Sequence, residues 1–172
     1  MADRALTGIL LVGGTSTRFG SPKAHAVFRG ETLAERAWRL LGEACEERLA
    51  VGSADGLPFA TVEDARTGAG PLAGIVAGLR SAAHDVCVVV PVDMPLLDVA
   101  ALHTLAEACR EAAVAQLGPL PGAYARSALP VLEEALDRGE LRLRDALARL
   151  DVSTVTLDPA KLRNVNTVDD LE

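Results

Sequence analysis

The stretch LLVGGTSTRFGSPKA, residues 10–24, runs from an apolar β-type segment into a loop of glycines, small hydroxyl residues and two cations. Glycines let backbone N–H groups approach an anion without a Cβ atom in the way. Arg18 and Lys23 add positive charge that is suited to holding phosphate oxygens. The stretch therefore predicts a strand that ends in a polyphosphate-binding loop.

Two common phosphate-binding patterns do not fit this loop. A Walker A loop needs Gly-Lys-Ser/Thr after four intervening residues, whereas residues 20–23 read GSPK. The dinucleotide fingerprint needs G-x-G-x-x-G, and Gly13-Gly14 does not supply that spacing. A glycine-rich turn with two incidental surface cations is the plainer alternative for the stretch.

The composition narrows the class of ligand. With 172 residues, 49% of them hydrophobic, the chain is long enough for one domain with a sizeable core, and we expect a single domain over residues 1–172. Three Phe, one Trp and one Tyr leave little for stacking on single-stranded nucleic acid. A net charge of −7 disfavours a nucleic-acid backbone as partner. A small polyphosphate ligand is still compatible with this net charge if local cations and a divalent metal offset the negative charge around it.

The sequence also favours a cytoplasmic protein that does not enter a membrane. No apolar run reaches the roughly 18 residues that a spanning helix needs, and residues 1–4 do not resemble a signal-peptide core. Cys45, Cys87 and Cys109 are widely spaced and odd in number, which argues against disulfides and a zinc site. We expect the three cysteines to be small buried residues.

Strand-like and helix-like segments alternate, which predicts an α/β fold with three layers, a Rossmann-like, mostly parallel sheet between helices. Thr32 and Glu35 form a capping-box pattern, Pro71 suits a first helical position, and Asp98 can cap a helix. The expected strands are 6–12, 49–51, 59–62, 86–90, 113–117 and 152–157, and the expected helices are 33–41, 72–82, 99–113, 127–136 and 141–150.

Polar residues follow three of the predicted strands. They are the opening loop, the pair Glu63-Asp64, and Asp93, which stands between two prolines after a buried strand. Ligands of open parallel sheets bind outside the carboxyl ends of the strands, so these groups can converge. A carboxylate at such a place suits Mg²⁺, which takes oxygen ligands and joins carboxylates to substrate phosphates.

The opening loop resembles the G-G-x-S-x-R-(M/F)-G-x-x-K signature of the MobA-like nucleotidyltransferases, most closely their molybdenum cofactor guanylyltransferase branch. Residues 92–95, VDMP, match the family's C-D-(M/T/S)-P element with Val92 in place of Cys, and residues 68–75 resemble G-P-L-(A/G)-G-(I/M/L). The resemblance implies catalytic roles for Arg18, Lys23 and Asp93, with Mg²⁺ on Asp93. It implies nucleotide binding by Leu11, Val12, Gly13, Gly14, Lys23, Asp64 and Asp93.

The chain ends in NVNTVDDL, residues 164–171, which is similar to the family's N-(V/I)-N-T-(P/x)-(E/D)-(E/D)-L ending. Thr167 and Asp170 also make a local cap, which explains part of this pattern. Asn164 and Asn166 point to the same side of an extended segment and could line the acceptor end of the cleft. Pro22, where many relatives carry Asp, and residues 118–124, where many carry His-Pro, depart from the family pattern.

Taken as a whole, the resemblance implies Mg²⁺-dependent transfer of GMP from GTP to the terminal phosphate of molybdopterin, with release of pyrophosphate. A protein that delivers molybdopterin is a possible further partner. Three alternatives stay open: transfer from CTP, transfer to another phosphorylated acceptor, and a nucleotide-binding domain without catalysis. The sequence alone does not choose the base.

Overall fold

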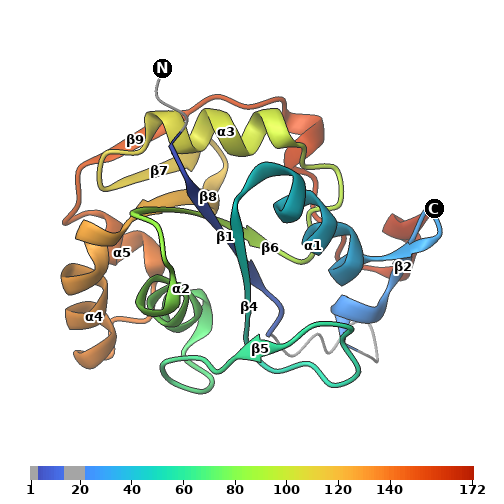
Figure 1. The fold of residues 1–172 in the computed structure, drawn as a ribbon, viewed down its shortest axis with the longest axis horizontal. Helices are drawn as coiled ribbons and strands as arrows, with labels where there is room; N and C mark the ends of the chain where they lie inside the picture. The colour runs from blue at the N-terminus through green and yellow to red at the C-terminus, as the bar shows by residue number, and fades with distance from the viewer. Residues whose placement is uncertain (1–3, 14–21) are drawn as a thin grey trace.

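A computed structural model describes residues 4–13 and 22–172, so Gly14 and Arg18 lie outside the described residues. The main sheet has seven strands in the order β5-β4-β1-β6-β8-β7-β9, and α-helices pack on both faces (Figure 1). The strands are β1 (Leu6–Leu11), β4 (Glu47–Val51), β5 (Thr61–Val62), β6 (Val86–Pro91), β7 (Ala112–Ala115), β8 (Gly118–Ala125) and β9 (Val152–Val155).

Most of the sheet is parallel, which confirms the predicted fold class. Strand β1 pairs in parallel with β4 and β6, β4 pairs in parallel with β5, and β7 pairs in parallel with β9. Strand β8 runs antiparallel to both of its neighbours, β6 and β7. Residues 86–90 are buried on both faces of the sheet, as expected for a central strand of a parallel sheet covered by helices.

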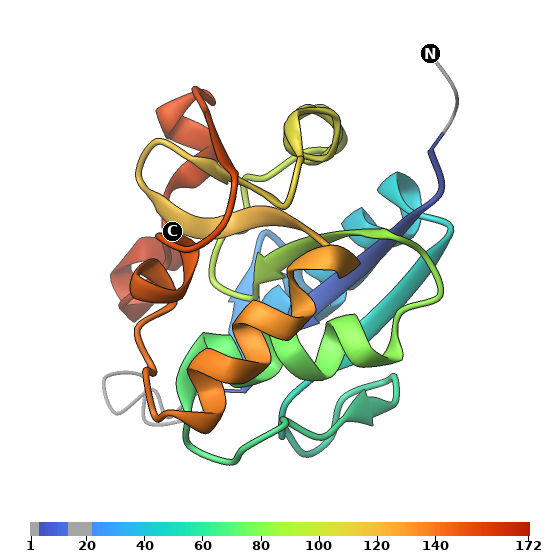
Figure 2. The same ribbon diagram turned by 90° about the vertical axis from the view of Figure 1, so that its left-hand side faces the viewer.

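The helices form the two outer layers (Figure 2). They are α1 (Leu33–Ala44), α2 (Gly70–Ser81), α3 (Val99–Ala108), α4 (Leu129–Asp137) and α5 (Leu143–Leu147). Helices α1 and α3 share one apolar cluster with Leu10, Val88 and Val90, while α2, α4 and α5 share the other with Ile9 and Val89. Successive strand residues thus serve opposite cores, because side chains alternate across a sheet.

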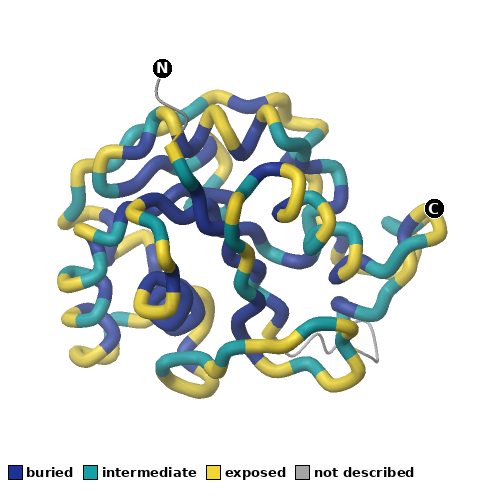
Figure 3. The backbone as a smooth tube through the Cα atoms, viewed as in Figure 1, coloured by how far each residue is buried: buried dark blue, intermediate teal, exposed yellow. Residues whose placement is uncertain are grey.

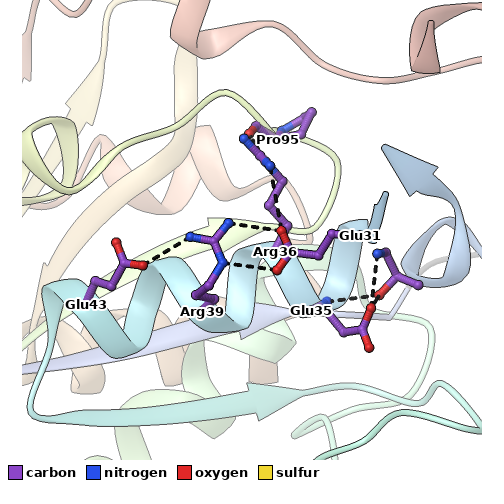
Figure 4. Close-up of polar contacts among 7 residues, drawn as sticks. Glu31, Glu35, Arg36, Arg39, Glu43 and Pro95 are labelled. Atoms are coloured by element: carbon purple, nitrogen blue, oxygen red, sulfur yellow. Dashed lines mark hydrogen bonds and ion pairs between the residues drawn. The ribbon is translucent and has the colours of Figure 1, made fainter. Parts of the chain in front are cut away.

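Local capping starts two of the helices where the sequence predicts. Thr32 and Glu35 form the full capping box at the start of α1, drawn in Figure 4. The carboxylate of Asp98 accepts a hydrogen bond of 2.9 Å from the Ala101 amide at the start of α3. Pro71 lies in the first turn of α2, as expected. These contacts satisfy helix amides that would otherwise lack partners.

Short elements complete the fold. Beyond the central sheet, β2 (Val27–Phe28) and β3 (Glu31–Thr32) form a small antiparallel hairpin that follows the turn η1 (Lys23–His25). The 3₁₀ helices η2 (Arg126–Ala128), η3 (Pro159–Leu162) and η4 (Val168–Leu171) lie in the second half of the chain. Figure 1 shows η4 close to β2, so the carboxyl-terminal segment returns to the region that follows the opening loop.

The segment 99–113 and the strand β8 are the main differences between the expected elements and the structure. The segment 99–113 is not one helix: α3 ends at Ala108, and β7 begins at Ala112. Alanines lie on both sides of this boundary, so the apolar pattern alone does not mark it. Strand β8 is not among the expected strands, and Pro119 and Pro121 are unusual inside a sheet. Both prolines lie in the first half of β8, ahead of its pairing with β6 at residues 122–125.

Burial concentrates on the central strands and the helix faces that cover them (Figure 3). Cys87 and Cys109 are buried and Cys45 is half-buried; burial raises the pKa of all three thiols, to about 11 for Cys109. The prediction of small buried cysteines therefore holds for two of the three. In the described part of the chain, every helix is too short or too polar to cross a membrane.

The contact of α2 with β1 supplies a stability test. A Cβ atom on Gly78 would lie 2.5 Å from Cδ1 of the fully buried Ile9, whereas one on Gly42 would meet the guanidinium of Arg48, at the end of a flexible side chain. Both alanines gain similar helix propensity. Relative to Gly42→Ala, Gly78→Ala should lower the free energy of unfolding by about 1–3 kcal/mol in urea titrations. Equal free energies of unfolding for the two variants would mean that the interface between α2 and β1 relaxes around the added methyl group.

Candidate active site

The candidate site lies at the carboxyl ends of β1, β4, β5 and β6, the edge that the sequence predicts. Leu11 is opposite Pro91 in the parallel ladder of β1 and β6, so the two strands end side by side. Gly13 follows β1 by two residues, and Asp93 follows β6 by two residues. The buried Val12 donates its amide to the carbonyl of Val51 at 3.0 Å, which holds the start of the opening loop against β4.

Lys23 and Asp93 meet at this edge from positions 70 residues apart. Nζ of Lys23 lies 3.2 Å from Oδ2 of Asp93, and each side chain is 21% exposed. Partial burial reduces solvent screening of this ion pair relative to a pair at the open surface. The structure thus brings together a cation and a carboxylate that the sequence assigned to the same chemistry.

The carboxyl-terminal segment closes the site from a third direction. Its buried residue Val165 donates its amide to the carbonyl oxygen of Asp93 at 2.8 Å. The side-chain oxygen of Asn166 accepts a hydrogen bond of 3.4 Å from Nζ of Lys23. The backbone amide of Asn166 donates to the Asp170 carboxylate within the η4 cap. Asn164 is exposed, and its side chain forms no hydrogen bond with the described residues.

Asp64 lies beside Gly13 and Gly74. Its carboxyl oxygens come within 3.6 Å of a Cβ built on Gly13 and 3.2 Å of one built on Gly74. Desolvation by burial raises the pKa of this carboxyl above its usual range. Among the described residues, no group forms a hydrogen bond or ion pair with Asp64. A partly dehydrated acceptor of this kind is suited to hydroxyl or amino donors of a ligand.

Two glycines allow close packing at this edge. Gly52 follows β4 with φ of 116°, and a Cβ there would lie 2.6 Å from the Gly13 nitrogen. A Cβ on Gly74, in the first turns of α2, would lie 2.8 Å from Leu11 Cδ2. Helix α2 therefore packs closely on β1 at Gly74. Sequence reasoning missed Gly52, although a glycine directly after a buried strand is a recognisable signal.

A metal ion would need ligands from outside the protein at this place. Within residues 4–13 and 22–172, no three or more His, Cys, Asp or Glu side chains gather as a metal-binding cluster. Asp93 alone offers carboxylate oxygens beside Lys23. Mg²⁺ commonly takes only one or two protein carboxylates and completes its shell with water and substrate phosphates. The donor set therefore fits a metal that arrives with a phosphate-bearing ligand.

Residues 8–154 match the model of a family described as the MobA-like NTP transferase domain. The chain belongs to this family. MobA-like proteins similar to it include a probable molybdenum cofactor guanylyltransferase of Deinococcus radiodurans, 38% identical over 96% of this chain and 92% of that protein. Another protein with the same description, from Opitutus terrae, is 37% identical over 85% of this chain and 79% of its own length. The resemblance noted in the sequence is confirmed, and the protein is a nucleotidyltransferase.

Solved MobA-like structures share the fold. The molybdopterin-guanine dinucleotide biosynthesis protein A of Archaeoglobus fulgidus superposes with a TM-score of 0.82 at 26% identity, over 96% of this chain and 94% of that one. A 2-C-methyl-D-erythritol 4-phosphate cytidylyltransferase of Thermus thermophilus has a TM-score of 0.70 at 19% identity, over 95% and 94% of the two chains. At that identity the second likeness concerns the fold alone.

The raised pKa of Asp64 predicts a gain in stability when its charge is removed. At pH 7 the carboxylate is charged in both states but dehydrated only in the folded one, so Asp64→Asn should raise the melting temperature of the nucleotide-free protein. As the pH falls below the raised pKa, Asp64 becomes protonated in the folded protein, and the difference in melting temperature should shrink. Below about pH 4 the carboxyl is protonated in both the folded and the unfolded state, and the difference should disappear. Scanning calorimetry across this pH range provides the measurement.

The exposed neighbour Glu63 offers the matched control for this experiment. Glu63→Gln removes one charge from the same loop but no buried carboxylate, so it should not reproduce the gain. A lower melting temperature for Asp64→Asn at pH 7 would show that the carboxylate stabilises the folded protein.

Proposed function

We propose that this nucleotidyltransferase transfers GMP from GTP to the terminal phosphate of molybdopterin, with Mg²⁺ and release of pyrophosphate. The observation that carries the proposal is the Lys23–Asp93 pair at the adjoining ends of β1 and β6, in a chain of the MobA-like family. The names of relatives at 37% and 38% identity support guanine as the base and the molybdenum cofactor as the acceptor.

The donor side of the site would be built around the opening loop. Backbone groups of Leu11, Val12, Gly13 and Gly14 would face the nucleotide, with Asp64 as an acceptor for its hydroxyl or amino groups. Lys23 and Arg18 would hold the phosphates and stabilise the departing pyrophosphate; Gly14 and Arg18 lie outside the described residues. Transfer of a nucleotidyl group depends mainly on alignment and on neutralising phosphate charge, which cations of this kind supply.

Asp93 would hold Mg²⁺ through its carboxylate. The bound ion supplies charge neutralisation and fixed geometry at the phosphates. The same carboxylate is paired with Lys23 in the structure. We propose that phosphate oxygens take over Lys23 when GTP binds, which releases the carboxylate for the metal. Lys23 would then move from a protein carboxylate to a substrate anion of the same charge sign.

The acceptor side would lie along the carboxyl-terminal segment, where Asn164 and Asn166 offer amide donors and acceptors. An oxygen of the acceptor phosphate forms a bond to the α-phosphorus of GTP, and the bond from that phosphorus to the bridging β-phosphate oxygen breaks. Pyrophosphate leaves with the electron pair. The acceptor phosphate is already ionised near neutral pH, so the reaction needs no general base.

A protein that delivers the labile acceptor fits this scheme, and full turnover with free molybdopterin would exclude the need for such a protein.

Nucleotide choice can be tested by thermal shift with GTP, CTP, UTP and ATP, each with and without Mg²⁺. A ligand at about 100 times its dissociation constant adds roughly 2.7 kcal/mol. At about 2–4 °C per kcal/mol this amounts to several degrees for a protein of this size. We expect a Mg²⁺-dependent shift with GTP. A shift with CTP alone would reassign the base, and no shift with any nucleotide would contradict the proposal.

The catalytic role of Asp93 can be tested with GTP, Mg²⁺ and molybdopterin, by measuring pyrophosphate release. Asp93→Asn should lower kcat by about 100-fold or more, since it removes the proposed metal ligand. Asp85, exposed at the opposite end of the same strand, provides the control, and Asp85→Asn should leave kcat unchanged. Wild-type turnover with a different phosphorylated acceptor alone would keep the chemistry but overturn the choice of molybdopterin.

A further inference from the structure

Arg36 on α1 reaches the segment that carries Asp93. Its Nε donates a hydrogen bond of 2.6 Å to the carbonyl oxygen of Pro95, two residues after Asp93 (Figure 4). A guanidinium donor makes this a charge-assisted hydrogen bond, which is stronger than a neutral one. The Arg36 side chain is only 26% exposed, so water competes weakly for the donor.

The segment after Asp93 borders a hollow next to α1. Met94, Pro95 and Leu97 line one wall of a cavity of about 410 Å³, and side chains of α1 line the other. Pro95 and Leu97 are themselves buried and Met94 packs against the apolar core, so a polar contact across the hollow adds a directional hydrogen bond to this packing. Arg36 supplies such a contact from the helix wall.

Arg36 is itself held in place by the hairpin that follows Lys23. Its guanidinium lies 3.7 Å from the carboxylate of Glu31 on β3 and 5.4 Å from the centre of the Phe28 ring on β2. The planar fork of arginine can face a carboxylate, a ring and a carbonyl together, which a lysine ammonium does less well. Arg36 thus links the hairpin next to Lys23 with the segment next to Asp93.

We propose that Arg36 is a positioning residue that holds the Asp93 carboxylate in the geometry required for Mg²⁺ and Lys23. The inference rests on the proposed function for its effect on metal use, while the tether itself can be tested without substrate. Val165 holds the carbonyl of Asp93 from the opposite side. The Asp93–Pro95 backbone is therefore fixed at two points, one provided by the carboxyl-terminal segment and one by α1.

Arg39 provides a matched control on the same helix. It pairs with Glu31 at 3.0 Å and with Glu43 at 3.1 Å, and it shares the wall of the same cavity. Among the described residues, Arg39 forms no hydrogen bond or ion pair with residues 93–97, and its side chain is 52% exposed. Arg39→Gln therefore removes a charge next to Glu31 without removing the contact to Pro95.

The first measurement is hydrogen exchange in the protein without nucleotide or metal. Two amides report on the tethered segment: Val165, which donates to Asp93, and Leu97, which donates to Met94. Arg36→Gln should speed exchange at both amides relative to wild type and to Arg39→Gln, since local opening controls their protection. Arg36→Lys, which keeps one charged donor, should restore part of the protection. Exchange in Arg36→Gln that matches Arg39→Gln would overturn the proposal.

The second measurement separates metal use from nucleotide binding. In GMP transfer, Arg36→Gln should raise the Mg²⁺ concentration for half-maximal rate by about 10- to 100-fold, as is typical when a group that orients a metal ligand is lost. The melting-temperature shift measured with GTP in the absence of Mg²⁺ should be the same in Arg36→Gln as in wild type. Arg39→Gln should behave as wild type in both measurements. An equal rise in the Mg²⁺ requirement of Arg36→Gln and Arg39→Gln would contradict the positioning role. If the wild-type protein transfers no GMP, the proposed function is refuted. The hydrogen-exchange experiment still tests whether Arg36 holds the Asp93–Pro95 segment.

Discussion

Parallel hydrogen bonding among β4, β1 and β6 determines where the ends of these strands lie. These strands pair over most of their length, and β1 and β6 are buried almost throughout by two separate apolar layers. Even the buried hydroxyl of Thr7 is satisfied, by hydrogen bonding to Glu47 at 2.6 Å. The parallel register sets Leu11 opposite Pro91, so Gly13 and Asp93, each two residues further along the chain, follow the strands at the same edge of the sheet.

That edge concentrates groups that are costly to keep together without a ligand. The carboxyl of Asp64 is partly dehydrated, which raises its pKa, and Lys23 and Asp93 form a pair that is mostly withdrawn from water. A carboxyl whose pKa is raised by burial, close to a partly buried ion pair, is characteristic of a ligand-binding site. Stability is supplied elsewhere, by the aliphatic cores and by contacts such as the bond from Arg36 to Pro95.

The order of strands explains which parts of the fold escaped prediction. β8 inserts between β6 and β7 in the antiparallel direction, and its prolines lie ahead of its pairing with β6. No local pattern encodes that choice, because it depends on which sheet edge is available when the chain returns. The same holds for Arg36: a single arginine on an amphipathic helix is normally a solvated residue, and only the path of the Asp93 segment gives it an acceptor.

The sequence by itself determined the alternation of strands and helices, the starts of α1 and α3, and the residue types at the strand ends. These features rest on periodicity and on capping contacts within three or four residues, so they are local. Only the tertiary structure decided that Lys23 meets both Asp93 and Asn166, across separations of 70 and 143 residues. Such meetings depend on strand order and chain path, which arise from packing the whole chain into two apolar layers around one sheet.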